Sequence, residues 1–229
     1  MADKANSACS QAWRVAKSLS EKILAQGKNG VWSPACVASL LTIVRKGASG
    51  ATRRELDMLL GDGDMFGERD PFGIELERNW GYDGYDANSA TAAWLSRSAS
   101  PSEAFLHECD KCGVHVSIDD LADPRISQRV TDWMAEQTHG LLSPDIELSP
   151  VALACLVSTL YMKDAWADPF DGESTKVETF HAKDGDAQAA FMHDKRDCAV
   201  IVENGSVAFL LPLSSDAAMC FVLPSGEGD

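Results

Sequence analysis

Positive charge is scarce in this sequence. Its 229 residues include 20 Lys and Arg against 35 Asp and Glu, which gives a formal net charge of −15. Nucleic acids and anionic membrane surfaces are bound mainly through basic residues that neutralise phosphate groups. We therefore expect no nucleic acid and no membrane among the partners, and the acidic surplus mainly indicates a soluble protein.

Long apolar runs and a leader segment are also missing. The longest apolar run, residues 152–162, is shorter than the about 20 residues that a membrane-spanning helix needs. Residues 1–17 lack the apolar stretch of a secretory signal. The seven cysteines cannot all pair within one chain, so we expect mostly reduced thiols. These features favour a cytoplasmic location, although a secreted form whose signal has been removed would leave the same pattern.

Motifs of catalytic sites are absent as well. No G-x-S-x-G, H-E-x-x-H or P-loop pattern occurs in the sequence, and the spacing of Ser, His and Asp does not argue for a triad. We therefore predict that the protein is not an enzyme and that it needs no cofactor. The composition otherwise fits a globular protein with a sizeable core, with 45% hydrophobic and 24% charged residues.

Helical patterns dominate the first half of the chain and short strand patterns the last third, which indicates an α+β fold. Ser33 followed by Pro34 is typical of a helix start, and Thr52 with Glu55 predicts a capping box. The apolar, β-branched segment 150–162 predicts a buried central strand. The predicted helices cover residues 8–26, 34–45, 52–61, 100–112 and 125–139. The other predicted strands cover residues 87–97, 114–118, 175–181, 187–192, 198–203, 206–213 and 217–223.

Six short motifs follow one another along the chain. They read N-x-x-x-S-P at 29–34, G-A-x-G-x-T at 47–52, V-T-D-W-M…T-x-G at 130–140, L-V-S-T-L-Y-M-K-D-A-W-A-D-P-F at 156–170, T…F…M at 175–192 and F-V-L-P at 221–224. Their content, order and spacing resemble those of the serpins, a family of serine-protease inhibitors. The positions that match the family's structural motifs are Asn29, Pro34, Gly47, Thr52, Thr138, Gly140, Lys163, Pro169, Phe170, Thr175, Phe180 and Pro224.

The resemblance implies one serpin-like α+β domain over residues 1–229. It would have a multi-helix N-terminal half, a central mixed sheet A, and C-terminal strands of sheets B and C, with the fold incomplete. The resemblance also implies a mechanism, in which a serine or cysteine protease cleaves an exposed reactive-centre loop. The loop then inserts into the large sheet as a new strand and carries the acylated protease with it, which releases strain stored in a metastable native state.

The resemblance further implies two regions that control loop insertion. Ser33, Cys36 and Ser158 would lie in the shutter, where the strands part, and Trp166 would lie in the breach. The family has Ser at the position of Cys36 and Asn at the positions of Ser158 and Thr131. Cys is a weak hydrogen-bond donor and Ser is a shorter one than Asn. Two interpretations stay open: a shutter repacked without consequence, and a weakened gate with altered metastability.

The sequence stops at Asp229, before the family's hinge, reactive loop and several core strands. No reactive bond can therefore be named in this chain. The strand near 151–163 would also lose its family neighbour, and a long apolar strand edge favours aggregation. We expect a fragment, a truncated reading frame, or a chain that a second chain completes.

Two other classes of function remain open. The first is a non-inhibitory serpin-fold protein that acts as a binding or structural module. The second is a redox or metal protein built on Cys109 and Cys112, which form a C-x-x-C flanked by His107 and His115. No second C-x-x-C follows, so we predict a helix end with two half-buried thiols and no metal site. Residues 62–86 are acidic where a heparin-binding helix would lie, so we expect no heparin either.

Overall fold

The computed structural model describes residues 2–24, 30–61, 85–182, 184–215 and 217–225. Its contacts divide the chain into two units, a first unit of Met1–Arg78 and Ala87–Met162 and a second of Asn79–Asp86 and Lys163–Asp229. The elements before residue 163 are α1 Ala2–Leu24, α2 Pro34–Gly47, α3 Gly50–Leu60, β1 Asp86–Ser96, α4 Glu103–Lys111, β2 His115–Asp119, α5 Pro124–Gln137 and β3 Ala154–Lys163. Asn29 and most of the acidic segment 62–86 lie outside the described residues.

The strands of the first unit form a mixed sheet in the order β2-β1-β3. Strands β1 and β2 run parallel, with Trp94 opposite Ser117. The amide of Ser96 donates to the Leu153 carbonyl at 2.9 Å, while Thr91, earlier in β1, contacts Ser158, later in β3. Residue numbers thus rise along β1 as they fall along β3, so these two strands run antiparallel. The mixed sheet that the sequence predicted is confirmed.

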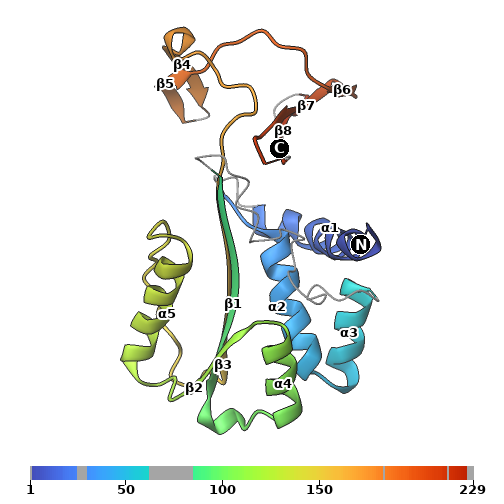
Figure 1. Ribbon diagram of the computed structural model, residues 1–229, viewed down its shortest axis with the longest axis vertical. Helices are drawn as coiled ribbons and strands as arrows, with labels where there is room; N and C mark the ends of the chain where they lie inside the picture. Colours follow the sequence, from blue (N-terminus) through green and yellow to red (C-terminus); the bar gives the residue numbers. More distant parts are fainter. Residues whose placement is uncertain (1, 25–29, 62–84, 183, 216, 226–229) are drawn as a thin grey trace. The chain divides into compact units, whose positions relative to one another are not determined.

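Helices cover both faces of this sheet (Figure 1). Alternate residues of β1 point to opposite faces, because side chains alternate along a strand. Ala93 and Leu95 join a core with α1, α2, α3 and α4, whose other buried members are Val15, Ala38, Ile43, Leu60, Cys109 and Val114. Ala92 and Trp94 join a second core under α5, with Leu121, Ile126 and Val130. The sheet is therefore the middle layer of the first unit.

Helix α2 starts where the sequence predicts. Ser33 is its N-cap, and the hydroxyl of Ser33 accepts a hydrogen bond from the Cys36 amide at 3.2 Å, with Pro34 in the first turn. Pro fits there because the first amides of a helix have no partner within the helix. The Ser-Pro signal depends only on neighbouring residues, and the predicted helix start is confirmed.

The predicted capping box at Thr52 is wrong. Helix α3 begins at Gly50 after the N-cap Ser49, and Thr52 is an exposed residue inside the helix. Gly50 has a φ of 61°, a conformation that glycine adopts at little cost. The chain therefore turns into the helix at this glycine, two residues before the threonine.

The prediction of a buried central strand over 150–162 is also wrong. Strand β3 is the last strand in the described sheet, and only Thr159 along it is buried. Leu160 and Met162 are 37% and 46% exposed. Among the described residues, no strand pairs with the edge of β3 that faces away from β1. The expected open apolar edge is thus present, and β3 lacks a second neighbour among the described strands that would help to cover its side chains.

The described part of the second unit contains one short 3-10 helix, Gly172–Ser174, and otherwise strands. It contains a hairpin of β4 Lys176–Ala182 and β5 Gly185–Phe191, and a three-stranded antiparallel sheet of β6 Val200–Glu203, β7 Ser206–Pro212 and β8 Ala218–Leu223. Asn204 and Gly205 join β6 to β7 with φ values of 49° and 80°. Two positive φ values in a two-residue loop define the turn that the Asn-Gly pair predicted.

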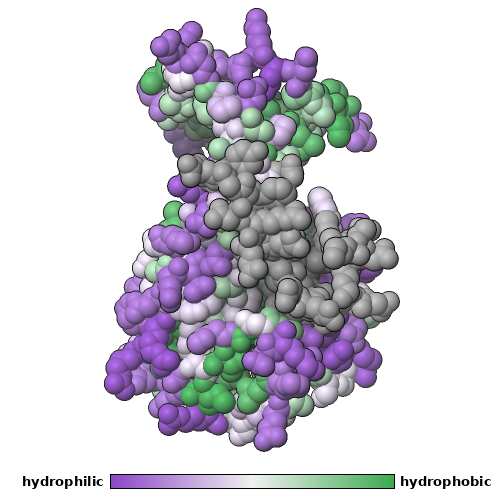
Figure 2. Space-filling model, in the orientation of Figure 1, coloured by the Kyte–Doolittle hydropathy of each residue, from purple (hydrophilic) through white to green (hydrophobic). Residues whose placement is uncertain are grey.

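Both faces of the sheet β6-β7-β8 are apolar. One face carries Val200, Val202, Val207, Phe209, Leu211, Met219, Phe221 and Leu223, as the strand register requires. The other face carries Ile201, Ala208, Leu210, Cys220 and Val222. Val202 is 69% exposed on the first face and Ile201 is 67% exposed on the second. Figure 2 shows apolar residues at the surface of this unit. An antiparallel sheet with two apolar faces needs a cover on each side.

Candidate functional site

The predicted shutter residues lie on two elements of the first unit. Thr91 of β1 donates a hydrogen bond from its hydroxyl to the Ser158 hydroxyl of β3 at 3.3 Å, and Thr91 is 7% exposed. The hydroxyl of Thr159 reaches the Ala90 carbonyl at 3.5 Å. Side-chain hydrogen bonds thus supplement the backbone pairing of β1 with β3, and Ser158 takes part in them.

Ser33 and Cys36 lie at the start of α2. Among the described residues, no hydrogen bond joins either of them to Ser158. Their neighbours Ala35 of α2 and Leu156 of β3 pack against the same hydrophobic core. The hydroxyl of Ser33 is used to cap its own helix. A shutter role for the three residues stays a prediction.

The predicted breach residue Trp166 lies at the centre of a line of aromatic rings in the second unit. Its ring centroid lies 5.7 Å from that of Phe170, edge to face, and 6.4 Å from that of Phe221. Phe221 stacks on Phe209 at 5.0 Å. The backbone of Trp166 also forms an isolated β-bridge with Leu213. These contacts hold Trp166 against the sheet β6-β7-β8.

Arg196 lies at one end of this line of rings, and no sequence motif predicted it. The guanidinium carbon lies 4.1 Å from the centre of the Phe170 ring, a favourable cation–π contact. Its Nη1 donates to the Asp168 carbonyl at 2.8 Å, and its Nε donates to Asp194 at 3.0 Å. The side-chain hydrogen bonds from Arg196 to Asp194, and then the Lys195 amide, lower the pKa of Asp194. No spacing rule connects residues 170 and 196, so only the fold reveals this contact.

Two of the matched motif positions have clear packing roles. A Cβ atom on Gly47 would lie 3.0 Å from the Phe105 ring, so a larger residue would fit only if that ring of α4 shifted. The buried hydroxyl of Thr138 donates to the Met134 carbonyl at 2.7 Å and accepts from the Leu142 amide at 3.0 Å. After α5 the chain turns through His139 and Gly140, with φ values of 51° and 81°, and the Gly140 amide donates a hydrogen bond to the Ala135 carbonyl at 2.7 Å.

The other matched positions contribute less to the cores. Phe180 is 52% exposed and lies 6.5 Å from Phe191 across the hairpin. The remaining exposed positions are Thr52, Lys163, Pro169, Thr175 and Pro224. The match of these exposed positions to the family pattern is therefore not explained by burial among the described residues.

The C-x-x-C segment lies at the end of α4, where Cys112 is the C-cap. Cys109 is fully buried and Cys112 half-buried, so the predicted pair of half-buried thiols is right only for Cys112. Burial, and then the neighbouring Cys112, raise the pKa of Cys109 to about 11. Within the described part of the chain, no three His, Cys, Asp or Glu residues gather as a metal site would require.

Cys109 is expected to resist alkylation in the folded protein. At pH 8 a thiol of pKa 11 is about 0.1% thiolate, and only the thiolate reacts. The exposed Cys198 is the internal control and should be labelled first by iodoacetamide, with the sites read by peptide mass spectrometry. Labelling of Cys109 as fast as Cys198 without denaturant would contradict the buried position.

Comparison with known proteins identifies the class. A family model described as "Serpin (serine protease inhibitor)" matches residues 6–229, and the chain belongs to this family. The chain is 28% identical over 211 residues to a serine protease inhibitor of Cyanea capillata, an alignment that covers 86% of the chain and 55% of the relative. It is 26% identical over 214 residues to Serpin-Z2A of Oryza sativa subsp. japonica, covering 88% and 50% respectively. The chain thus spans about half the length of these curated relatives.

Solved structures confirm the predicted serpin-like α+β fold. The native stressed conformation of Arabidopsis AtSerpin1 matches with a TM-score of 0.83 at 23% identity, covering 97% of this chain and 61% of that one. Loop-cleaved lamprey angiotensinogen matches with a TM-score of 0.82 at 20% identity, covering 96% and 68%. Among the described residues, no helix has the length and apolar character needed to cross a bilayer.

Proposed function

We propose that this chain is the strand-accepting part of a serpin that inhibits serine or cysteine proteases by loop insertion, and that it is not an enzyme. The open edge of β3 carries this proposal. Strand β3 spans Ala154–Lys163, contains no Pro, and has no strand on its outer edge among the described residues. A strand that pairs there would extend the mixed sheet by main-chain hydrogen bonds.

The segment that meets the protease would lie outside residues 1–229, on the same polypeptide or on a second chain. The sheet β6-β7-β8 supports this part of the proposal. Its two faces are apolar and expose Val202, Leu223, Ile201 and Val222 by 64–69%, as expected of a sheet that further strands or another layer cover. The relatives contain about as many residues again as the part that this chain matches.

The setting that we propose is a cytoplasmic one, without heparin or metal. Among the described residues, no disulfide joins the cysteines Cys36, Cys109, Cys112, Cys155, Cys198 and Cys220. A reducing compartment keeps such thiols from pairing. The net charge of −15 disfavours a polyanionic cofactor by simple repulsion.

The test is a titration of proteases with the longest natural polypeptide that contains this chain. A panel of serine and cysteine proteases is incubated with increasing amounts of it, and the residual protease activity is measured. Loss of activity at a fixed molar ratio supports inhibition. The isolated 229-residue chain is the matched control, and it should not inhibit, because it lacks the loop.

A non-inhibitory serpin-fold binding or structural module is the second candidate. The hydrogen bond between Thr91 and Ser158 favours it, since the short Ser158 hydroxyl stands where the family has the longer Asn side chain in the predicted shutter. The titration separates the candidates. If every protease of the panel keeps its activity, whether or not it cleaves the polypeptide, the result supports the non-inhibitory module.

A further inference from the structure

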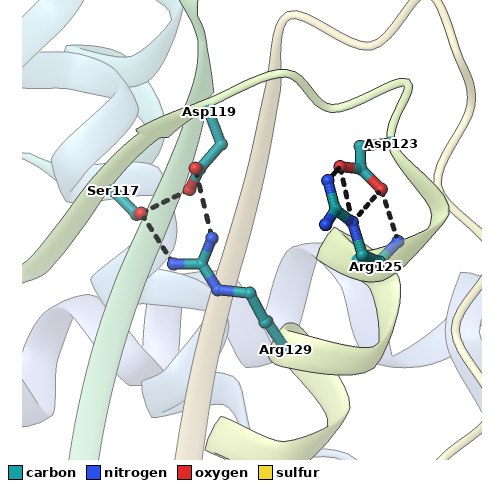
Figure 3. A network of polar contacts seen from close by, with 5 residues as sticks. All are labelled: Ser117, Asp119, Asp123, Arg125 and Arg129. Carbon is teal, nitrogen blue, oxygen red and sulfur yellow. Dashed lines mark hydrogen bonds and ion pairs between the residues drawn. The ribbon is translucent and has the colours of Figure 1, made fainter.

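Helix α5 is attached to the edge strand β2 by a ring of polar contacts (Figure 3). Arg129, in the second turn of α5, donates from Nη1 to the Asp119 carboxylate at 3.1 Å and from Nη2 to the Ser117 hydroxyl at 3.3 Å. The Ser117 hydroxyl in turn donates to the other oxygen of Asp119. The guanidinium therefore spans two residues of one strand, and we call these three residues the Arg129 clamp.

The environment of Asp119 keeps the clamp charged. The hydrogen bond from Ser117 lowers the pKa of Asp119 most, partial burial opposes this, and Arg129 lowers the pKa again. The Asp119 side chain is 19% exposed and that of Arg129 is 52% exposed. A charge-assisted contact at a partly buried carboxylate is stronger than an exposed ion pair.

Strand β2 has few other attachments to the sheet. It is five residues long, lies at the end of the order β2-β1-β3, and pairs only with β1 among the described strands. The opposite end of α5 is fixed to β1, where the Asn88 side-chain amide donates to the Gln137 carbonyl at 2.9 Å. Between these ends, Val130 and Trp133 of α5 pack against the core that contains Trp94.

A second ion pair on the same helix has a different geometry. Arg125 binds Asp123, the N-cap of α5, with both side chains in the first turn and Arg125 87% exposed. This pair lowers the pKa of Asp123 to about 2. Figure 3 shows that the Arg125–Asp123 pair lies at the start of the helix and does not reach β2. It is therefore a natural control for the charge change at Arg129.

We propose that Arg129 is a positioning residue that joins β2 and α5 into one cooperative unit. The clamp supplies the edge strand with an attachment that its short ladder to β1 does not.

The test is hydrogen exchange by mass spectrometry on the whole 229-residue chain, comparing R129Q with R125Q. R129Q is expected to raise the exchange rates of the amides of both β2 and α5 by about tenfold, the effect of losing charge-assisted hydrogen bonds. R125Q removes the same charge and should affect only the first turn of α5. The proposal is overturned if R129Q leaves β2 unchanged, or if the two variants behave alike.

A conservative variant covers the case in which R129Q disrupts the whole unit. Exchange in α2 reports such disruption, because α2 lies on the other face of the sheet. R129K keeps the charge but cannot span Asp119 and Ser117 with one planar group. If R129K speeds exchange in β2 and α5 while α2 keeps its exchange rate, the result supports the clamp. If R129K exchanges like the parent chain throughout, the result refutes it. Neither result depends on protease inhibition, so the proposed function stands or falls separately.

Discussion

Trp94→Ala is expected to lower the free energy of unfolding of the first unit by about 3–5 kcal/mol, the usual cost of removing a buried large aromatic side chain. Trp94 is 2% exposed and lies near the C-terminal end of β1. Its ring meets that of Trp133 edge to face at 5.5 Å, and it lies in the core between the sheet and α5. The substitution therefore leaves a cavity under the helix and removes a favourable aromatic pair.

The measurement is urea denaturation followed by far-UV circular dichroism. Trp13→Ala is the matched control, because Trp13 lies on α1 and is 71% exposed. That change should shift the unfolding free energy by less than about 0.5 kcal/mol. Equal effects of the two substitutions would contradict the placement of the core between β1 and α5.

Leu160→Lys is expected to make the isolated chain mostly monomeric at concentrations on the order of 10 μM, where exposed strand edges self-associate. Leu160 is 37% exposed on β3, next to the edge that has no strand partner among the described residues. A lysine on an edge strand opposes pairing with another chain by charge and by hydration.

Analytical ultracentrifugation measures this effect. Met58→Lys is the control, since Met58 is 73% exposed but lies on helix α3, which has no strand edge. The control should leave the association of the chain nearly unchanged. If both variants are equally monomeric, general solubility is responsible and the β3 edge is not the contact.

Local signals in the sequence predicted much of the fold. Ser33 with Pro34 marked the start of α2, and Asn204 with Gly205 marked the turn between β6 and β7, because each needs only neighbouring residues. The ordered motifs predicted the family, and the family model confirms it. The single-domain organisation over residues 1–229 stays a prediction, since the two contact units are described separately.

The errors and omissions depend on contacts between distant residues. An apolar, β-branched pattern suits a strand with two neighbours, and it could not show that β3 has only one described partner. Arg129 and Arg196 belong to no motif, and their partners are chosen by the fold. The sequence pattern can identify a charged residue, but it cannot tell which carboxylate or ring the residue meets.

The most direct test of the central claim is a search for an SDS-resistant complex. The longest natural polypeptide containing this chain is incubated with each protease of the panel and separated under denaturing conditions. Loop insertion with a trapped acyl-enzyme predicts a band with the combined mass of inhibitor and protease, which mass spectrometry identifies by peptides from both. Cleavage of the polypeptide by the proteases with no such band for any of them would contradict inhibition by strand insertion beside β3.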